Sequence, residues 1–187
     1  MSWNIPNLLV GLVAGLVLGE IIRFIRVWFT TQRQARLIRA ALYPEVQGNL
    51  DQLDALWGKL RPRKDPDEIH RVDKVSYARE FAQTELPQFS RRVYETQLSH
   101  LPVYIGRRQF AQLARFYASL ARLEQTHSEL RSAREQDIAD RSMALAGPGL
   151  YLPVSVTYDL FLRTAARSWD DIHHTIEQIL AEGNPLA

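Results

Sequence analysis

The chain has 187 residues, of which 24% are charged and none is cysteine. The absence of cysteine excludes disulfides, thiolate nucleophiles and cysteine-based zinc or iron–sulfur sites, and is compatible with a reducing cytoplasm. Lys and Arg total 23 against 21 Asp and Glu, which leaves a net charge of only +2 and argues against a nucleic-acid partner.

Residues 1–30 predict a transmembrane anchor. The run Leu8–Gly19 carries no charge, and a helix over Ile5–Phe29 would be about 37 Å long at 1.5 Å per residue. That length suffices to span a hydrocarbon core of about 30 Å with some tilt. Trp3 and Trp28 flank the run, as is typical of aromatic side chains at the two membrane interfaces.

The end of this segment predicts a membrane interface made by Glu20, Arg23, Arg26 and Trp28. Long arginine side chains can reach the headgroups from the end of a spanning helix. Glu20 is placed to pair with Arg23 three residues later. The alternative is a buried contact between Glu20 and another subunit, because an ionisable group at that depth needs a partner.

The charges also predict an orientation. No Lys or Arg precedes the apolar run and no small-residue cleavage site follows it, which argues against a cleaved signal peptide. Basic residues follow the span instead, continuing through Arg33, Arg36 and Arg39. The positive-inside rule therefore predicts an outside N-terminus and a cytoplasmic domain over residues 31–187, in a cell inner membrane. The same arginines could also contact anionic headgroups.

Three glycines predict a packing face within the anchor. Gly11, Gly15 and Gly19 recur every fourth residue, so they lie near one face of a helix and leave a groove that another helix can approach closely. The alternative is a plain lipid-facing anchor, because glycine is common in membrane helices. With one span in this chain, a packing partner would be another transmembrane subunit.

The remaining residues read as helices with apolar stripes, and no segment alternates with a strand's period of two. Pro44 predicts a kink near residues 40–44. The expected helices are Thr31–Leu60, Ser76–Thr84, Gln88–Ser99, Arg107 to about Asp140, and Val154–Glu182. The predicted fold is all-α, with a single N-terminal transmembrane helix followed by a small antiparallel cytoplasmic helical bundle.

Apolar residues at steps of three and four predict the core of that bundle. The first helix contributes Leu42, Val46, Asn49, Leu53, Leu56 and Leu60. The two long later helices contribute Leu113, Phe116, Leu120, Leu123, His127 and Leu130, and then Tyr158, Leu162, Ala165, Trp169, Ile172, Ile176 and Ile179.

Two short patches resemble a loose group of uncharacterised bacterial inner-membrane proteins that have one N-terminal transmembrane helix and a helical cytoplasmic domain. The first is Arg36-Leu-Ile-Arg-Ala-Ala-Leu-Tyr-Pro-Glu-Val-Gln-Gly-Asn-Leu50, directly after the span, and the second is Phe116-Tyr-Ala-Ser-Leu120. The resemblance implies a bacterial inner membrane. It implies no activity.

Glu124 and His127 have the Glu-x-x-His spacing used in di-iron helical bundles, where two such pairs and two further carboxylates enclose the metals. Asp170, Asp171, His173 and His174 offer an acidic variant on the last helix, and Glu45 and Glu80 are the only guesses for further carboxylates. The adjacent histidines point about 100° apart, so at most one faces inward. The set is incomplete, and we predict no metal and no cofactor.

A nucleophile elbow of the Gly-x-Ser-x-Gly type and a phosphate loop are both missing from the sequence, so no enzyme class is indicated. The segment 146–153 is unusually apolar for a loop, which suggests that Leu150, Tyr151 and Leu152 are covered. Their own bundle could cover them, and a partner protein or the membrane surface is the alternative.

These patterns predict a non-catalytic, single-pass accessory subunit that stabilises a larger inner-membrane complex, such as a photosynthetic or respiratory assembly. The expected partners are other transmembrane subunits and the lipid bilayer, with no nucleic acid. The alternative is a membrane-anchored signalling or defence protein that recruits a cytosolic partner.

Overall fold

The computed structural model describes residues 5–62, 70–146 and 154–187; residues 5–14, 71, 140–146, 154–161 and 163 are described by their backbone alone. Six helices and no strand occur within these ranges, so the all-α prediction is confirmed. The helices are α1 (Ile5–Leu60), α2 (Arg71–Gln83), α3 (Arg92–Gln97), α4 (Leu101–Tyr104), α5 (Arg107–Ala146) and α6 (Val154–Glu182).

Helix α1 has 56 residues and would extend about 84 Å at 1.5 Å per residue. Residues 5–30 of the predicted anchor and the predicted helix Thr31–Leu60 belong to this one helix. Pro44 lies inside α1 and does not end it. Leu42 and Val46 on either side are fully buried, so packing holds the helix where the proline removes a backbone hydrogen bond.

The short helices differ most from the prediction. Instead of one helix over residues 88–99, the chain is extended up to Arg91 and then forms α3 and α4. Pro102 lies in the first turn of α4, where its missing N–H group is not needed. Helix α2 begins five residues before the predicted Ser76.

The long helices α5 and α6 agree more closely with the sequence pattern. Helix α5 continues to Ala146, six residues beyond Asp140, and α6 has the predicted bounds. Gly183 follows α6 with a φ of +64°, a left-handed conformation that favours glycine at the end of a helix.

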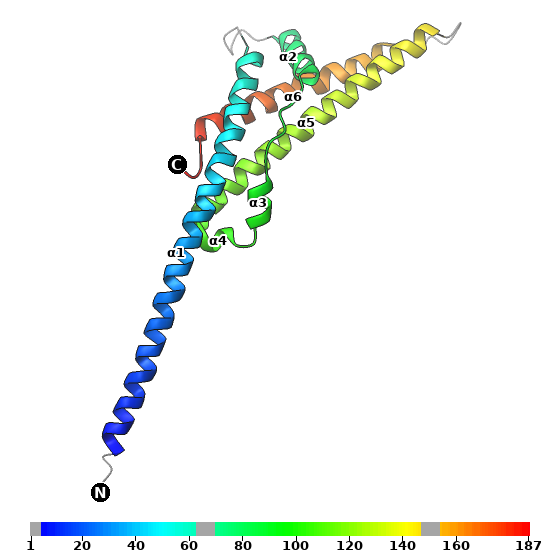
Figure 1. The fold of residues 1–187 in the computed structure, drawn as a ribbon. Helices are drawn as coiled ribbons and strands as arrows, with labels where there is room; N and C mark the ends of the chain where they lie inside the picture. Colours follow the sequence, from blue (N-terminus) through cyan, green and yellow to red (C-terminus); the bar gives the residue numbers. More distant parts are fainter. Residues whose placement is uncertain (1–4, 63–69, 147–153) are drawn as a thin grey trace.

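Helices α5 and α6 form a long antiparallel hairpin, and α2 packs against both of them (Figure 1). The second half of α1 crosses this hairpin and contacts α6, α2, α3 and α4. The first half of α1 projects from the body on its own, and the tip of the α5–α6 hairpin projects in another direction (Figure 1). We call everything outside the first half of α1 the body.

The predicted stripes form the core of the body. All six predicted positions of α1 and all six of α5 are buried, including the polar Asn49 and His127. In α6, Ala165, Trp169, Ile172, Ile176 and Ile179 are buried, while Leu162 is half-buried and Tyr158 lies outside the residues with described side chains. Each large apolar side chain in this core stabilises the fold by roughly 1.5–3 kcal/mol.

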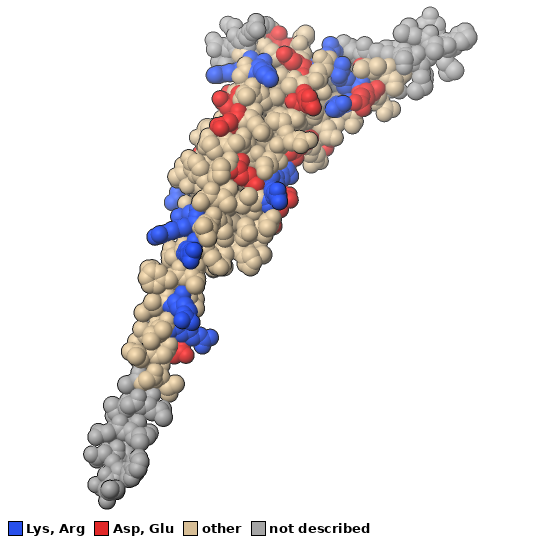
Figure 2. All heavy atoms as spheres, in the orientation of Figure 1, with Lys and Arg blue, Asp and Glu red and all other residues tan. Residues whose placement is uncertain are grey.

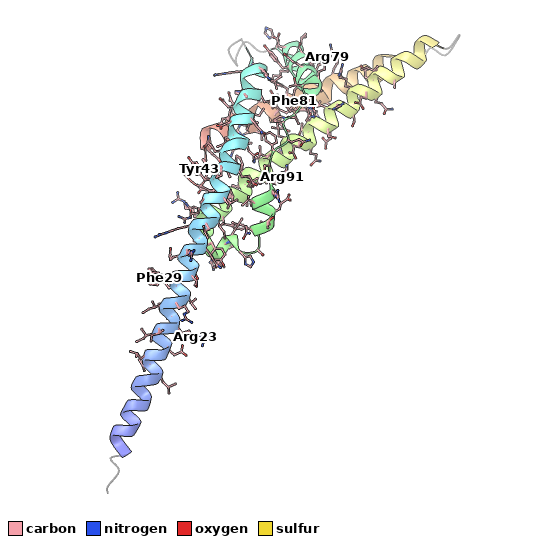
Figure 3. All side chains as sticks on the ribbon, in the orientation of Figure 1. Arg23, Phe29, Tyr43, Arg79, Phe81 and Arg91 are labelled. Carbon is pink, nitrogen blue, oxygen red and sulfur yellow. The ribbon has the colours of Figure 1, made fainter. Side chains whose placement is uncertain are left out.

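Aromatic side chains join the three layers of this core. The ring of Trp169 in α6 stacks on Tyr77 of α2 at 5.2 Å and on Trp57 of α1 at 6.2 Å between ring centroids. Phe81 of α2 is fully buried and lies within the body in Figure 3, in contrast to Phe29 on the bare part of α1. The body is therefore a single packed unit, which includes the second half of α1 and excludes the first half.

Candidate functional site

Residues 15–30 of α1, which we call the apolar segment, are exposed at every position. Their large apolar side chains are between 46% and 72% exposed. At 3.6 residues per turn, these side chains extend around about two thirds of the helix. They are Leu16, Val17, Leu18, Ile21, Ile22, Phe24, Ile25, Val27, Trp28 and Phe29. The remaining face carries Gly15, Gly19, Arg23, Arg26 and Thr30.

The polar groups of the apolar segment find partners within the same helix. Arg23 pairs with Glu20 at 3.8 Å, as the spacing predicted, and the alternative contact of Glu20 with another subunit is untested. The Thr30 hydroxyl donates to the carbonyl oxygens of Arg26 and Val27, at 3.0 and 2.9 Å. Arg23 and Phe29 project away from the helix axis into open space (Figure 3).

The glycine face of the apolar segment is open. A Cβ atom added at Gly15 or at Gly19 would meet no atom within 4 Å. The third predicted glycine, Gly11, lies outside the residues whose side chains are described. No part of the body that the structure describes therefore covers this face.

Among the fully described residues, no helix has a segment long and apolar enough to cross a membrane. The first part of the predicted anchor, residues 1–14, lies outside that set. Leu150, Tyr151 and Leu152 of the predicted partner-contact loop also lie outside the described residues.

A second feature of interest is a polar seam where α1 meets the connection between α2 and α3. Glu45 accepts hydrogen bonds from the backbone N–H groups of Val93 and Tyr94, at 2.7 and 3.1 Å. Its carboxylate also accepts from the Ser90 hydroxyl at 3.1 Å and from the Tyr117 hydroxyl at 2.6 Å. Glu45 thus caps the first turn of α3 from another helix, where a negative charge is favourable.

Asn49, one turn further along α1, holds the backbone of Ser90 from both sides. Its side-chain oxygen accepts from the Ser90 N–H at 2.8 Å, and its side-chain NH₂ donates to the Ser90 carbonyl at 2.7 Å. On the other side of the connection, His127 of α5 bonds the Thr84 carbonyl at 2.9 Å. The seam fixes an extended segment between two helices, which is a structural task.

Burial and the neighbouring Glu45 carboxylate raise the pKa of the Tyr117 hydroxyl far above its usual value of 10.0. Burial also raises the pKa of Tyr94, whose ring stacks on Tyr117 at 4.1 Å. Both tyrosines therefore stay neutral over the whole physiological range, and Tyr117 keeps its hydrogen bond to Glu45. Neither is poised to act as a base.

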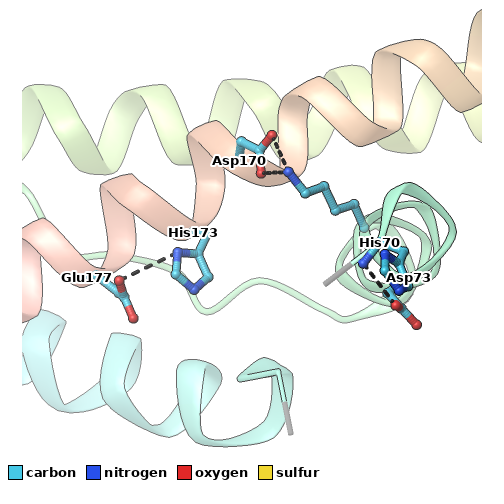
Figure 4. Close-up of polar contacts among 6 residues, drawn as sticks. His70, Asp73, Asp170, His173 and Glu177 are labelled. Atoms are coloured by element: carbon cyan, nitrogen blue, oxygen red, sulfur yellow. Dashed lines mark hydrogen bonds and ion pairs between the residues drawn. The ribbon is translucent and has the colours of Figure 1, made fainter. Parts of the chain in front are cut away.

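The residues that resembled metal ligands are held by protein partners instead. Glu124 pairs with Arg91, Asp170 with Lys74 at 2.7 Å, and Asp171 with Arg122 at 3.4 Å. Figure 4 shows the Lys74–Asp170 pair and the separate contact between His173 and Glu177. The described residues contain no group of three or more potential ligands that could hold a metal ion.

The neighbouring histidines behave as the helix geometry predicted. His173 is half-buried against the ring of Trp57 at 5.1 Å, whereas His174 is exposed. Glu80, a further guess for a carboxylate ligand, is exposed as well.

A shallow groove of about 510 Å³ between α5 and the end of α6 was not predicted from the sequence. Its lining includes Arg115, Gln112, Phe116 and Ile179. Ser119 and Glu182 also line it, but Glu182 accepts a hydrogen bond from Gln178 at 2.9 Å, and Arg122 pairs with Asp171. The groove offers no arrangement that defines a reaction.

Comparison with protein-family models, with curated proteins and with solved structures finds no match for this chain. The apolar segment, whose large apolar side chains are exposed, is the strongest candidate site.

Proposed function

We propose that this protein is a non-catalytic, single-pass accessory subunit of an inner-membrane complex. In this proposal the first half of α1 lies in the bilayer, with its N-terminus outside, and the body braces the complex on the cytoplasmic side. The observation that carries the proposal is the apolar segment, whose ten large apolar side chains are about half exposed or more and extend around about two thirds of a bare helix.

The size of the exposed surface supports a permanent cover. At about 1 kcal/mol for each half-exposed side chain, ten of them would gain on the order of 10 kcal/mol from leaving water. This gain is comparable to the whole stability of a typical domain, about 5–15 kcal/mol. A monomer with this segment in water would associate readily.

The distribution of the apolar side chains favours lipid as the main cover. A helix that packs on one partner in water shows an apolar stripe that is about 100° wide or somewhat more, whereas a helix that is apolar all round lies in a core or in a membrane. The large apolar side chains here extend around about 240° of the helix, which is wider than one stripe. The open face at Gly15 and Gly19 then provides the place where a helix of another subunit could approach.

The arginines support the proposed orientation. Between Glu20 and Glu45 the sequence contains Arg23, Arg26, Arg33, Arg36 and Arg39 and no acidic residue. Such an excess of basic residues after a span is typical of the cytoplasmic side. The partners held by Glu124, His127 and Glu45 support a structural use for these residues.

One observation favours the alternative, a membrane-anchored protein that recruits a cytosolic partner for signalling or defence. The tip of the α5–α6 hairpin extends well away from α1 (Figure 1), and Ile138 near it is 52% exposed. An arm of this kind could hold a partner at a distance from the membrane.

Copurification from mild detergent tests the proposal. We expect the full chain to remain with membranes in high salt, to require detergent for release, and then to migrate with one large complex at fixed stoichiometry. Release by salt alone would contradict the membrane span. Release by detergent as a free chain would contradict the accessory-subunit function and favour the recruiting alternative.

A further inference from the structure

We propose that α4 and the turns on either side of it lie on the anionic headgroup surface and form a second contact with the membrane. This contact surface, which we call the shoulder, consists of residues 98–108. The inference rests on the proposed function, because it takes the first half of α1 as the membrane span.

Two hydrogen bonds fix the level of the shoulder along α1. The Tyr104 hydroxyl donates to the side-chain oxygen of Gln34 at 2.7 Å. Arg39 donates to the side-chain oxygen of Gln109, just beyond the shoulder, at 3.0 Å. Residues 98–108 are therefore held beside the part of α1 that directly follows the apolar segment.

This level corresponds to the headgroup region. Gln34 follows Phe29 by five residues, which is about 7 Å along a helix. A bilayer has a core of about 30 Å within a total of about 40–45 Å, so its headgroup layers are roughly 5–8 Å thick on each side. If α1 leaves the hydrocarbon near Phe29, Tyr104 lies at or just above the headgroups.

The shoulder has exposed apolar side chains beside buried ones that attach α4 to the rest of the body. Leu101 and Ile105 are buried, at 0% and 2% exposure, and fix α4 to the body. Between them Val103 is 71% exposed, and the nearby Leu98 is 43% exposed. Exposed aliphatic side chains gain free energy by insertion into the boundary between headgroups and acyl chains.

The charged residues within the shoulder and on the facing part of α1 are basic, and the exposed Glu95 lies just before the shoulder. Arg107 and Arg108 are exposed at the start of α5, and Arg33 and Arg36 are exposed on α1. The sequence contains no Asp or Glu between Glu20 and Glu45 or between Glu95 and Glu124. In Figure 2 the lower margin of the body is mostly tan, with basic side chains beside it along α1.

These properties select an anionic bilayer as the occupant. Exposed aliphatic groups surrounded by arginines match an interface in which anionic headgroups lie above acyl chains. The apolar segment would bring such a surface to the level of the shoulder, so no further binding partner is needed to cover Val103.

Single labelled cysteines can test the proposal, because the natural chain contains none. Three variants of the full chain, Phe24→Cys, Val103→Cys and Val72→Cys, would carry a fluorophore and be reconstituted in vesicles that contain a headgroup-level nitroxide lipid. Val72 is 81% exposed and lies on α2, away from the shoulder. The vesicles would contain either phosphatidylcholine alone or a mixture with phosphatidylglycerol.

We expect quenching of the label at 103 to exceed that at 72 several-fold in phosphatidylglycerol vesicles, and to fall in phosphatidylcholine alone or with Arg107→Glu and Arg108→Glu together. Equal quenching at 103 and 72, or equal quenching at 103 in the two kinds of vesicle, would overturn the headgroup contact. If a nitroxide placed in the acyl chains fails to quench the label at 24, the proposed membrane span itself is wrong.

Discussion

The two halves of α1 belong to one continuous helix but have opposite surroundings. In the second half, apolar residues lie in a stripe at steps of three and four, and α2, α4 and α6 contact that half. In the first half, the apolar segment carries such side chains around about two thirds of the helix, and the described body covers none of them. A stripe indicates a helix that its own chain covers, whereas a wider apolar surface that the chain leaves bare indicates a cover from outside the chain.

The largest effect on the fold is expected from the loss of a buried tryptophan. Trp169 of α6 and Trp28 in the first half of α1 provide the comparison. Trp169 is 1% exposed and stacks within the core, whereas Trp28 is 51% exposed. We expect Trp169→Ala to destabilise the body by about 3–5 kcal/mol. Trp28→Ala should change the free energy of unfolding of the body by less than about 0.5 kcal/mol.

Urea unfolding followed by circular dichroism in detergent solution would measure both values. If Trp28→Ala lowered the free energy of unfolding as much as Trp169→Ala, the apolar segment would be part of the folded body, and the two halves of α1 would not differ in their surroundings.

The polar seam provides the next test, because its hydrogen bonds join the second half of α1 to the rest of the body. Asn49→Ala would remove two part-buried hydrogen bonds to the N–H and carbonyl groups of Ser90, so we expect a loss of about 1–2 kcal/mol. Gln52→Ala, at an exposed position of the same helix, is the matched control and should have almost no effect. Thermal unfolding of the two variants would decide, and similar melting temperatures would contradict the role assigned to Asn49.

Tyr117 should make the stability of the body sensitive to high pH. Its pKa is raised in the folded state by burial and by Glu45, so its contribution is fully present below the unfolded value of about 10. Above that pH the unfolded state loses the proton first, and stability should fall by up to about 1.4 kcal/mol per pH unit.

The Tyr117→Phe variant should be less stable near pH 7 by about 1 kcal/mol, because one hydrogen bond is lost. Its stability should decline less steeply between about pH 10 and pH 11.5 than that of the natural protein. Unfolding curves over this range would measure the two slopes, and equal slopes would show that Tyr117 titrates freely in the folded state.

Gly15→Leu should have the smallest effect on the fold and a selective effect on association. The substitution keeps the helix apolar, and nothing in the described structure lies within 4 Å of the added Cβ. We expect normal membrane insertion and an unchanged body, but loss of the large complex in detergent, because a neighbouring helix would be held away from the backbone.

Two controls accompany Gly15→Leu. Gly58→Leu makes the same change at an exposed position in the second half of α1, and Leu16→Ile changes another face of the apolar segment. Both should copurify normally. Equal copurification of all three variants would assign the attachment to Glu20 or to the body in place of the glycine face.

The sequence predicted those features that depend on apolar periodicity. The long helices and the buried positions from Leu42 to Ile179 followed from steps of three and four, because burial on one helix face repeats along the chain. Even Asn49 and His127 were placed correctly in their stripes. The i to i+3 pair of Glu20 and Arg23 was predictable for the same reason, since both partners lie on one helix.

The features that were missed depend on partners far apart in the chain. Glu45 was considered only as a possible metal ligand, whereas its carboxylate caps α3 about 48 residues later. The division of residues 88–104 into an extended segment and two short helices follows from that cap and from Asn49, because short helices need tertiary contacts. A single sequence does not show which distant groups meet.

The central claim is that lipid, together with a neighbouring helix on the glycine face, keeps water from the large apolar side chains of the apolar segment, and cysteine accessibility in intact membranes tests it most directly. Single cysteines at each position from Leu16 to Phe29 in this cysteine-free chain would be exposed to a water-soluble maleimide, with Leu37→Cys, exposed at 62%, as the reference. We predict protection at every apolar position and rapid labelling at 37. Labelling that matches the reference on one or more faces of the helix would contradict the claim.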